Sequence, residues 1–295
     1  MHGSEVIFYK YLSPQGTLAT LEQQSLKWAC PTSFNDPFDF PTDIDFNFTA
    51  EELSSALIEE LIQITYGENE PVGNNENKFF QMGLAARRKL NKPSEAQTRK
   101  HFEASHQMLI EDYPRHLTAR RSLFNSFRKE YSVLCLSSSH ENLLMWAHYC
   151  GNHQGCVLGF RCLPHLDNAI RTAVAVNYVD SYPLFASLDE LIKQATGQQD
   201  LDYDKLLHHF FYSKSNHWVY ENEWRCVNPL QNRAAGYDLI SWVPEELEVI
   251  YMGFNATSEF KQRVLRFIDA KSPHTQVYQS KPDIQNYALI YEQLR

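Results

Sequence analysis

The sequence lacks a long apolar run. None of its uninterrupted apolar stretches approaches the roughly 18 residues that a membrane-spanning helix needs. Near the start of the chain, Glu5 and Lys10 occupy positions where a secretory signal peptide would carry apolar residues. We therefore expect no membrane segment and no export signal, and we predict a cytoplasmic protein.

Cysteine is scarce, with six residues in a chain of 295. Most of them have apolar or aromatic neighbours, and a chain of this length can bury a core without disulfides, so reduced thiols are predicted. Four possible metal ligands do lie close together: His148, Cys150, His153 and Cys156. Structural zinc sites usually draw on a second pair of ligands elsewhere in the chain, and no suitably spaced pair follows, so no metal site is predicted.

Basic residues are fewer than acidic ones. The chain has 27 Lys and Arg and 36 Asp and Glu, which give a formal net charge of -9. This balance disfavours a general affinity for phosphate backbones. The basic residues are nevertheless concentrated in 87–130, which holds 11 of them against 5 acidic residues. Either a solvated helical face or a docking surface for nucleic acid or an acidic partner would explain this segment.

The first third of the chain contains signals for both strands and helices. Residues 6–12 are rich in β-branched and aromatic side chains and predict a strand, with a short helix at 18–27 and a proline-rich loop after it. Capping boxes at Thr49 with Glu52, and at Ser94 with Gln97, begin two further helices. We predict a single domain, 1–295, with a helical insertion at 49–130.

After residue 130, short strand patterns follow one another. Strands are predicted at 131–136, 155–161, 172–179, 223–228, 239–243, 247–253 and 287–291, and helices at 187–196, 203–212 and 258–269. Regular alternation of strand and helix is missing, so the fold class is predicted as α+β with a mixed or antiparallel sheet.

The most informative run surrounds two acidic residues, Glu221 and Glu223, and also contains Trp218, Tyr220 and Arg225. On an extended segment, residues two apart point to the same face, so both carboxylates would reach one ligand. Paired carboxylates under aromatic cover can stabilise an electron-poor centre. A surface ion pair of Glu221 beside core aromatics would be the structural alternative.

Two other segments present polar groups next to aromatic ones. Ser137 begins a serine run that follows a predicted buried strand, and a segment with helical spacing of Trp146 and Tyr149 comes soon afterwards. On the first strand, Lys10 lies between Tyr9 and Tyr11, and alternation sends the lysine to the face opposite the tyrosines. A helix cap, core aromatics and a surface lysine would also explain these patterns.

Several blocks together resemble a bacterial family that is catalogued as a domain of unknown function. They are Tyr9-Lys10-Tyr11, Phe34-Asn35-Asp36-Pro37-Phe38, Met145-Trp146-Ala147-His148-Tyr149 with Gly155-Cys156-Val157-Leu158-Gly159-Phe160, Trp218-Val219-Tyr220-Glu221-Asn222-Glu223-Trp224-Arg225 and Val249-Ile250-Tyr251-Met252-Gly253. This resemblance covers most of the chain outside the helical insertion, and it names no activity.

The order of the motifs also resembles ADP-ribosyltransferases of the Arg, Ser-Thr-Ser, Glu-x-Glu type, with Lys10 in place of the first-strand arginine. The resemblance implies NAD as the substrate and an ADP-ribosyltransferase-like fold. It assigns catalytic roles to Glu223, Glu221 and Ser137. It assigns cofactor-binding roles to Lys10, Tyr9, Tyr11, Asn35, Trp146, Tyr149 and Arg225. A bacterial toxin or phage-defence effector, acting on a protein or nucleic-acid acceptor and held by an antitoxin or defence partner, is the setting that it implies.

Two other functions fit parts of the sequence. A nucleic-acid processing toxin would use His140, His148 or His153 as acid and base, and would dock through the basic segment 87–130. A module that senses a nucleotide or binds a partner would use the same pocket as the transferase without turnover. NAD consumption separates the transferase from both alternatives.

Overall fold

The computed structural model describes residues 6–40, 46–104, 106–184 and 186–295. The chain divides into two compact units. The sheet unit comprises Met1–Phe40, Phe127–Ser181 and Phe211–Arg295, and the helical unit comprises Pro41–Ser126 and Tyr182–Phe210. The prediction of a single domain is not tested by this division into units.

The helical unit is built from amphipathic helices. They are α2 (Ala50–Tyr66), α3 (Lys78–Arg87), α4 (Glu95–Glu103), α7 (Leu188–Ala195), most of α5 (His106–Glu130) and most of α8 (Tyr203–Tyr212). The capping boxes expected at the starts of α2 and α4 are present, and Ser187 with Glu190 forms another at the start of α7. Leu57, Leu61, Phe102 and Ile192 pack into its core. Helix α7 thus joins the helices of 49–130 in one unit, and in the described part of the chain no helix is both long and apolar enough to cross a membrane.

The sheet unit contains a ten-stranded sheet among the described residues. Its strands are β1 (Ile7–Leu12), β2 (Ser25–Ala29), β3 (Tyr131–Ser137), β4 (Cys156–Arg161), β5 (Val174–Ala175), β8 (Glu223–Pro229), β9 (Tyr237–Ser241), β10 (Leu247–Met252), β11 (Gln276–Asp283) and β12 (Ala288–Gln293). The main path runs β12-β11-β10-β4-β1-β3-β2-β9, while β8 pairs with β3 and β5 pairs with β8. Only β10 and β11 are parallel among these described pairs, so the predicted α+β class with a mixed, mostly antiparallel sheet is confirmed.

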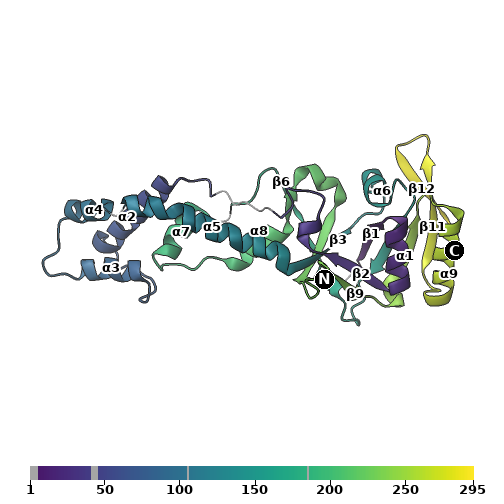
Figure 1. Cartoon of the computed structure of the whole chain (residues 1–295), viewed down its shortest axis with the longest axis horizontal. Coiled ribbons are helices and arrows are strands. Elements are labelled where there is room, and N and C mark those ends of the chain that lie inside the picture. Colours follow the sequence, from purple (N-terminus) through teal and green to yellow (C-terminus); the bar gives the residue numbers. More distant parts are fainter. Residues whose placement is uncertain (1–5, 41–45, 105, 185) are drawn as a thin grey trace. The chain divides into compact units, whose positions relative to one another are not determined.

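Helices pack on both faces of this sheet (Figure 1). On one face, α1 (Pro14–Gln23) and α9 (Ser258–Lys271) enclose a core that includes Phe8, Leu136 and Leu158. On the other face, α6 (Leu143–Tyr149) packs its Trp146 against Tyr11. Short elements complete the unit: η1 (Pro31–Ser33), η2 (Ala169–Thr172), η3 (Asn216–Glu221), η4 (Pro244–Glu246) and the parallel pair β6 (Asn177–Val179) and β7 (Ser213–Ser215).

Two predictions of local structure were wrong, and one strand was not predicted. The helix expected at 18–27 ends at Gln23, because Gln24 adopts a left-handed conformation with φ 47° and the chain then enters β2. The strand expected at 172–179 is divided between η2, β5 and β6. Strand β11 was not expected from the sequence, and it pairs with both β10 and β12.

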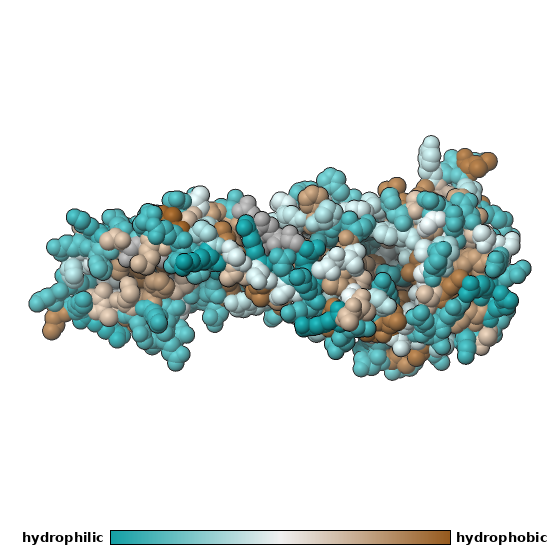
Figure 2. Space-filling model, viewed as in Figure 1, coloured by the Kyte–Doolittle hydropathy of each residue, from teal (hydrophilic) through white to brown (hydrophobic). Residues whose placement is uncertain are grey.

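The hairpin of β11 and β12 ends in a solvent-exposed turn. Ile284 is 96% exposed and Tyr287 is 102% exposed, and Figure 2 shows apolar surface at the tip of this projecting hairpin. Single exposed apolar side chains are ordinary on protein surfaces. Tyr287 therefore provides a tyrosine without a packing role, which is useful as a control for the buried tyrosines of the sheet.

Candidate functional site

Five charged side chains of the sheet unit form a buried network, which we call the charge network. Its members, each at most 9% exposed, are Asp39, Lys214, Glu221, Glu223 and Arg225. Charged groups are removed from water only where partners compensate them, because an isolated buried ion is very costly. The network contains three carboxylates and two cations, so its formal charge is negative if all five groups are ionised.

Arg225 is the centre of the network. It is 0% exposed. Its Nη1 and Nη2 donate to the two carboxylate oxygens of Asp39 at 3.1 and 2.6 Å. Its Nε donates to Glu223 Oε1 at 2.9 Å, and Nη2 also donates to Glu223 Oε2 at 3.1 Å. The planar guanidinium thus holds two carboxylates at once, as its fork of donors allows.

Lys214 joins the two glutamates. Its Nζ donates to Glu221 Oε2 at 2.5 Å and to Glu223 Oε2 at 2.9 Å, and it lies 5.1 Å from the centre of the Trp218 ring. The remaining Glu221 oxygen, Oε1, accepts a 2.6 Å hydrogen bond from the hydroxyl of Tyr149. Every carboxylate oxygen of the two glutamates therefore has a donor.

The two glutamates converge through a kink in the backbone. Glu221 ends η3, Glu223 begins β8, and Asn222 between them has a left-handed conformation with φ 46°. The expectation of an extended segment was wrong, although both carboxylates do reach the same ammonium group. Asparagine suits this position because it tolerates positive φ better than most residues.

Ser137 lies opposite Glu223 in the ladder of β3 and β8, and opposite Tyr9 in that of β3 and β1. Residues directly opposite one another in a sheet share a face, so Tyr9, Ser137 and Glu223 form one row across three strands. The Ser137 hydroxyl donates to the backbone carbonyl of Glu221 at 2.6 Å and accepts from the N–H of Ser139 at 3.1 Å. Ser137 thus fixes the segment that carries Glu221.

Aromatic side chains surround the charge network. Tyr149, Tyr178, Trp218 and Tyr220 are partly buried. The Tyr178 hydroxyl accepts a 2.8 Å hydrogen bond from the Glu223 backbone N–H. Because of burial and the nearby carboxylates, the pKa of Tyr149 is raised, and that of Tyr178 is raised to about 12. Both phenols are therefore protonated at neutral pH and able to donate hydrogen bonds.

Lys10 does not join this group. It neighbours Tyr9 on β1, so its side chain leaves the sheet on the face opposite Tyr9 and Ser137. Its Nζ donates to the backbone carbonyl of Cys135 at 2.7 Å. Strands β1 and β2 pair with β3 at Ser137 and at Val133, so Cys135 lies between the two points of contact. The ammonium there connects β1 with β3 where the two strands diverge.

The other predicted binding residues occupy different surroundings. Tyr11 and Trp146 are buried and packed edge to face, and their polar atoms donate to the backbone carbonyls of Ser139 and His140. Asn35 is exposed in the loop after η1. The structure therefore brings together six of the predicted site residues: Tyr9, Ser137, Tyr149, Glu221, Glu223 and Arg225. The other four, Lys10, Asn35, Tyr11 and Trp146, do not contact the charge network in the hydrogen bonds described above.

Sequence reasoning missed two members of the network. Asp39 belongs to the aromatic loop that begins at Phe34, and Lys214 forms part of the short strand β7. Neither lies in a motif that suggests chemistry. An acid within a loop rich in phenylalanine was the available signal for Asp39, because a carboxylate in apolar surroundings requires a partner.

Electrostatics keep Glu223 ionised. Burial alone would raise its pKa, but the charges of Arg225 and Lys214 outweigh burial and lower the pKa to about 2. Burial raises the pKa of Asp39 in spite of its contact with Arg225. The pKa of Lys214 is raised because the carboxylates of Glu223 and Glu221 outweigh the effect of burial.

We expect these shifts to give the folded protein a measurable pH dependence. The pKa of Glu223 is about 2 when folded and has an ordinary value of 4.5. Its contribution to stability is therefore fully present above about pH 4.5 and is lost as the pH falls toward 2. Urea unfolding at pH 7, 5, 4 and 3 should show this loss in the wild type and a smaller loss in Glu223→Gln. Asp39, whose pKa is raised by burial and in part by Glu223 itself, contributes with the opposite sign, so the comparison reports Glu223 together with its coupling to Asp39. If the free energy of unfolding falls equally with pH in the wild type and in Glu223→Gln, the lowered pKa of Glu223 is contradicted.

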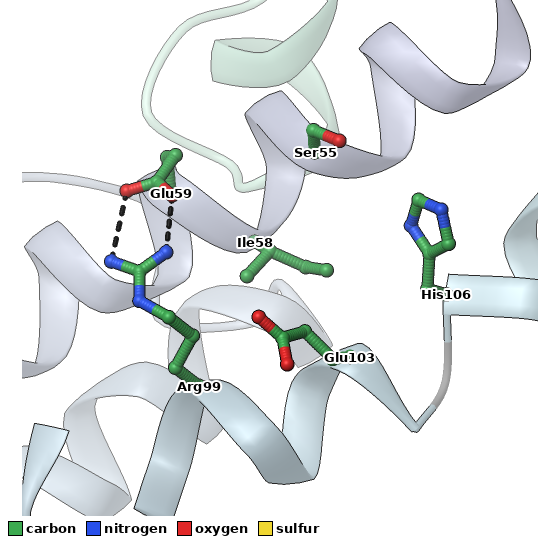
Figure 3. A pocket seen from close by; sticks show the side chains of 6 residues that line it. All are labelled: Ser55, Ile58, Glu59, Arg99, Glu103 and His106. Atoms are coloured by element: carbon green, nitrogen blue, oxygen red, sulfur yellow. Dashed lines mark hydrogen bonds and ion pairs between the residues drawn. The ribbon is translucent and has the colours of Figure 1, made fainter. Parts of the chain in front are cut away.

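Two cavities belong to the helical unit and not to this site. One of about 280 Å³ is lined by Ser55, Ile58, Glu59, Arg99, Glu103 and His106, and Figure 3 shows Glu59 and Arg99 bonded to each other beside it. Glu59 and Arg99 are 59% and 32% exposed, so their ion pair is a surface pair of small energetic value. The other cavity, of about 230 Å³, has mainly apolar walls that include Phe46, Leu57 and Leu117.

The histidines of the nuclease hypothesis lie among aromatic rings. His140 is stacked on Tyr251 and His153 on Trp146, and burial lowers the pKa of both imidazoles. His148 is exposed. Residues Cys150 and Cys156 are buried free thiols. Within the described ranges, no group of three or more His, Cys, Asp or Glu side chains has the arrangement of a metal site.

Comparison with known proteins identifies one similarity. Residues 145–226 match the model of a family described as a protein of unknown function (DUF2971), which supports the expected likeness to a domain-of-unknown-function family. The matched segment includes Tyr149, Lys214, Glu221, Glu223 and Arg225, while Asp39 and Ser137 lie outside it. No curated protein and no solved structure gives a significant match.

Proposed function

We propose that the protein cleaves the bond between nicotinamide and ribose in NAD, as an ADP-ribosyltransferase or an NAD glycohydrolase. The observation that carries this proposal is the row of Tyr9, Ser137 and Glu223 across the adjacent strands β1, β3 and β8, with Glu221 converging on the same ammonium group as Glu223. These strands carry the three motifs on which the resemblance to ADP-ribosyltransferases rests.

The chemistry requires a carboxylate that is ionised before the reaction begins. Departure of nicotinamide leaves an oxocarbenium-like ribose, which a nearby negative charge stabilises. Glu223, with a pKa of about 2, provides that charge at neutral pH, and Arg225 holds it in position. Glu221 would orient or deprotonate the acceptor, and its bond to Tyr149 would position it for this task.

Lys214 is the contact that substrate would replace in this proposal. It bridges the two glutamates, whereas Arg225 binds Glu223 from the side of Asp39. Ribose hydroxyl groups could donate to the carboxylate oxygens that Lys214 now engages, while Arg225 remains in place. The tyrosines and Trp218 around the network would provide aromatic surfaces for nicotinamide.

The test is incubation of the purified protein with labelled NAD, alone and in a bacterial lysate. We expect the label to leave NAD and to appear on protein, on nucleic acid or as free ADP-ribose, which identifies the acceptor. A toxin or defence effector is the proposed setting, and a co-purifying antitoxin would be removed by denaturation and refolding before the assay. Complete recovery of intact NAD under all these conditions would exclude the proposal.

A nucleotide-binding module without turnover is the second candidate. It is favoured by the full occupancy of the glutamate oxygens, because each already accepts a hydrogen bond from Tyr149, Lys214 or Arg225. Such a module would be stabilised by a ligand that it does not consume. A rise in melting temperature with NAD or ADP-ribose, combined with full recovery of the nucleotide, would identify this function.

A further inference from the structure

The face of the sheet that carries Ser137 and Glu223 continues into a group of aromatic side chains. We call this group the aromatic platform. Its members are Tyr9 on β1, Tyr251 on β10, Tyr278 on β11, Tyr291 on β12 and His140 in the loop after β3. All five are partly exposed, in contrast to the fully buried Trp146 nearby. The platform therefore presents ring surface to solvent.

Three rings of the platform are stacked nearly parallel, and two others are tilted against them. The His140 ring lies 4.1 Å from that of Tyr251 at an angle of 9°, and Tyr278 lies on Tyr251 at 5.4 Å and 23°. Tyr9 is tilted by 46° against His140 at 5.0 Å, and Tyr291 is tilted by 62° against Tyr251 at 4.8 Å. The imidazole of His140 thus occupies, on the face of Tyr251, the position that a planar nucleobase takes when it stacks on a tyrosine, so a base that binds here would replace this imidazole.

The strand register connects the platform to the charge network. Glu223 is opposite Ser137, Ser137 is opposite Tyr9, and Tyr9 is opposite Gly159 of β4. On the same face, Val157 of β4 is opposite Tyr251, which is opposite Tyr278. With strands spaced about 4.8 Å apart, Tyr9 on β1 lies on the order of 10 Å from β8, Tyr251 on β10 lies about 19 Å from it, and the platform ends on β12 at about 29 Å. The part of the platform between Tyr9 and Tyr251 lies at a distance that suits the two halves of an extended dinucleotide.

A glycine makes room for this arrangement. A Cβ atom at Gly159 would lie 3.1 Å from Cε1 of Tyr9 and 2.5 Å from Cγ1 of Val249. The missing side chain lets the Tyr9 ring approach the backbone of β4, in the interval between the charge network and the stacked rings.

We propose that the aromatic platform binds the adenine ring of NAD while the charge network acts on the bond between nicotinamide and ribose in the same molecule. In identifying the base as part of NAD, this inference rests on the proposed function. Single-stranded nucleic acid could offer the same chemistry. The exposed Glu141, whose charge acts on Tyr9, Tyr251 and Tyr291, disfavours a ligand with a long phosphate backbone and favours a single nucleotide unit.

Calorimetric titration of the full chain tests the inference. Adenosine, AMP, NAD and a single-stranded oligonucleotide serve as separate ligands. We expect adenosine and NAD to bind the wild type, and Tyr251→Ala to weaken both by about 10-fold or more, since loss of one stacking ring has an effect of this size. Tyr251→Phe keeps the ring and should bind as the wild type does. Tyr287→Ala, at the exposed hairpin tip, is the matched control.

The outcomes separate this inference from the proposed function. If adenosine does not bind at millimolar concentration, or binds Tyr251→Ala and Tyr278→Ala as well as the wild type, the platform is not a base site. Binding of the oligonucleotide without adenosine would also overturn it, in favour of a nucleic-acid surface. If adenosine binds but NAD is not consumed, the base site is supported and only the proposed NAD-cleaving activity is excluded. If NAD is consumed, Tyr251→Ala should raise KM and leave kcat nearly unchanged.

Discussion

Replacement of Arg225 by methionine is expected to lower the free energy of unfolding by about 3–5 kcal/mol. Arg225 is fully buried and binds both Asp39 and Glu223, so its removal leaves two buried carboxylates without their strongest partner. Methionine fills a similar volume, and the measured loss therefore reports the unpaired charges more than a cavity. Urea unfolding at pH 7 measures this difference.

Arg266→Met is the matched control, because Arg266 is exposed on α9 and its replacement should change stability by no more than about 0.5 kcal/mol. If Arg225→Met loses less than about 1 kcal/mol, the three side chains do not form a buried network. In the double variant Asp39→Leu with Arg225→Met, removal of one carboxylate should restore part of the lost stability. The pair would then be shown to interact directly.

Replacement of Glu223 by glutamine is expected to lower NAD turnover by about 10²-fold or more, if the proposed function is correct. Glutamine preserves the size of the side chain and one acceptor oxygen, but it removes the negative charge that stabilises the oxocarbenium-like ribose. The loss should fall mainly on kcat, because the charge acts most strongly in the transition state. Release of nicotinamide, followed over time, measures the effect.

Glu248→Gln is the control for this substitution. Glu248 is a carboxylate of β10 in the same sheet, paired with Arg161 and outside the charge network. It should leave turnover within about two-fold of the wild type. A melting curve for each variant at the assay pH shows whether the protein remains folded. Unchanged turnover in a folded Glu223→Gln variant would remove Glu223 from any catalytic role.

Much of the fold could be predicted because its signals are local. The capping boxes at Thr49, Ser94 and Ser187 depend on hydrogen bonds within four residues, and each is present. Strand β2 was missed because neither glycine nor proline marks the end of α1, where Gln24 turns the backbone at φ 47°. Strand β11 depends on its pairing with β10 and β12, which no local pattern records.

The site was predicted in part for the same reason. Glu221, Glu223 and Arg225 are close in sequence, so their association could be anticipated. Asp39 lies 186 residues from Arg225 along the chain, and only the folded sheet unit brings them together. The role of Lys10 followed from a motif, but strand alternation and the diverging edge of β3 direct its ammonium group to the carbonyl of Cys135.

The left-handed residue Asn222 gives the two acids unequal freedom. Glu223 is anchored on both sides, because β8 pairs with β3 and β5. Glu221 ends a 3₁₀ segment, whose hydrogen-bond geometry is weaker than that of an α-helix or a sheet. A molecule that replaced the Lys214 contacts would therefore meet one carboxylate held by the sheet, that of Glu223, and one held chiefly by side-chain hydrogen bonds from Ser137 and Tyr149, that of Glu221.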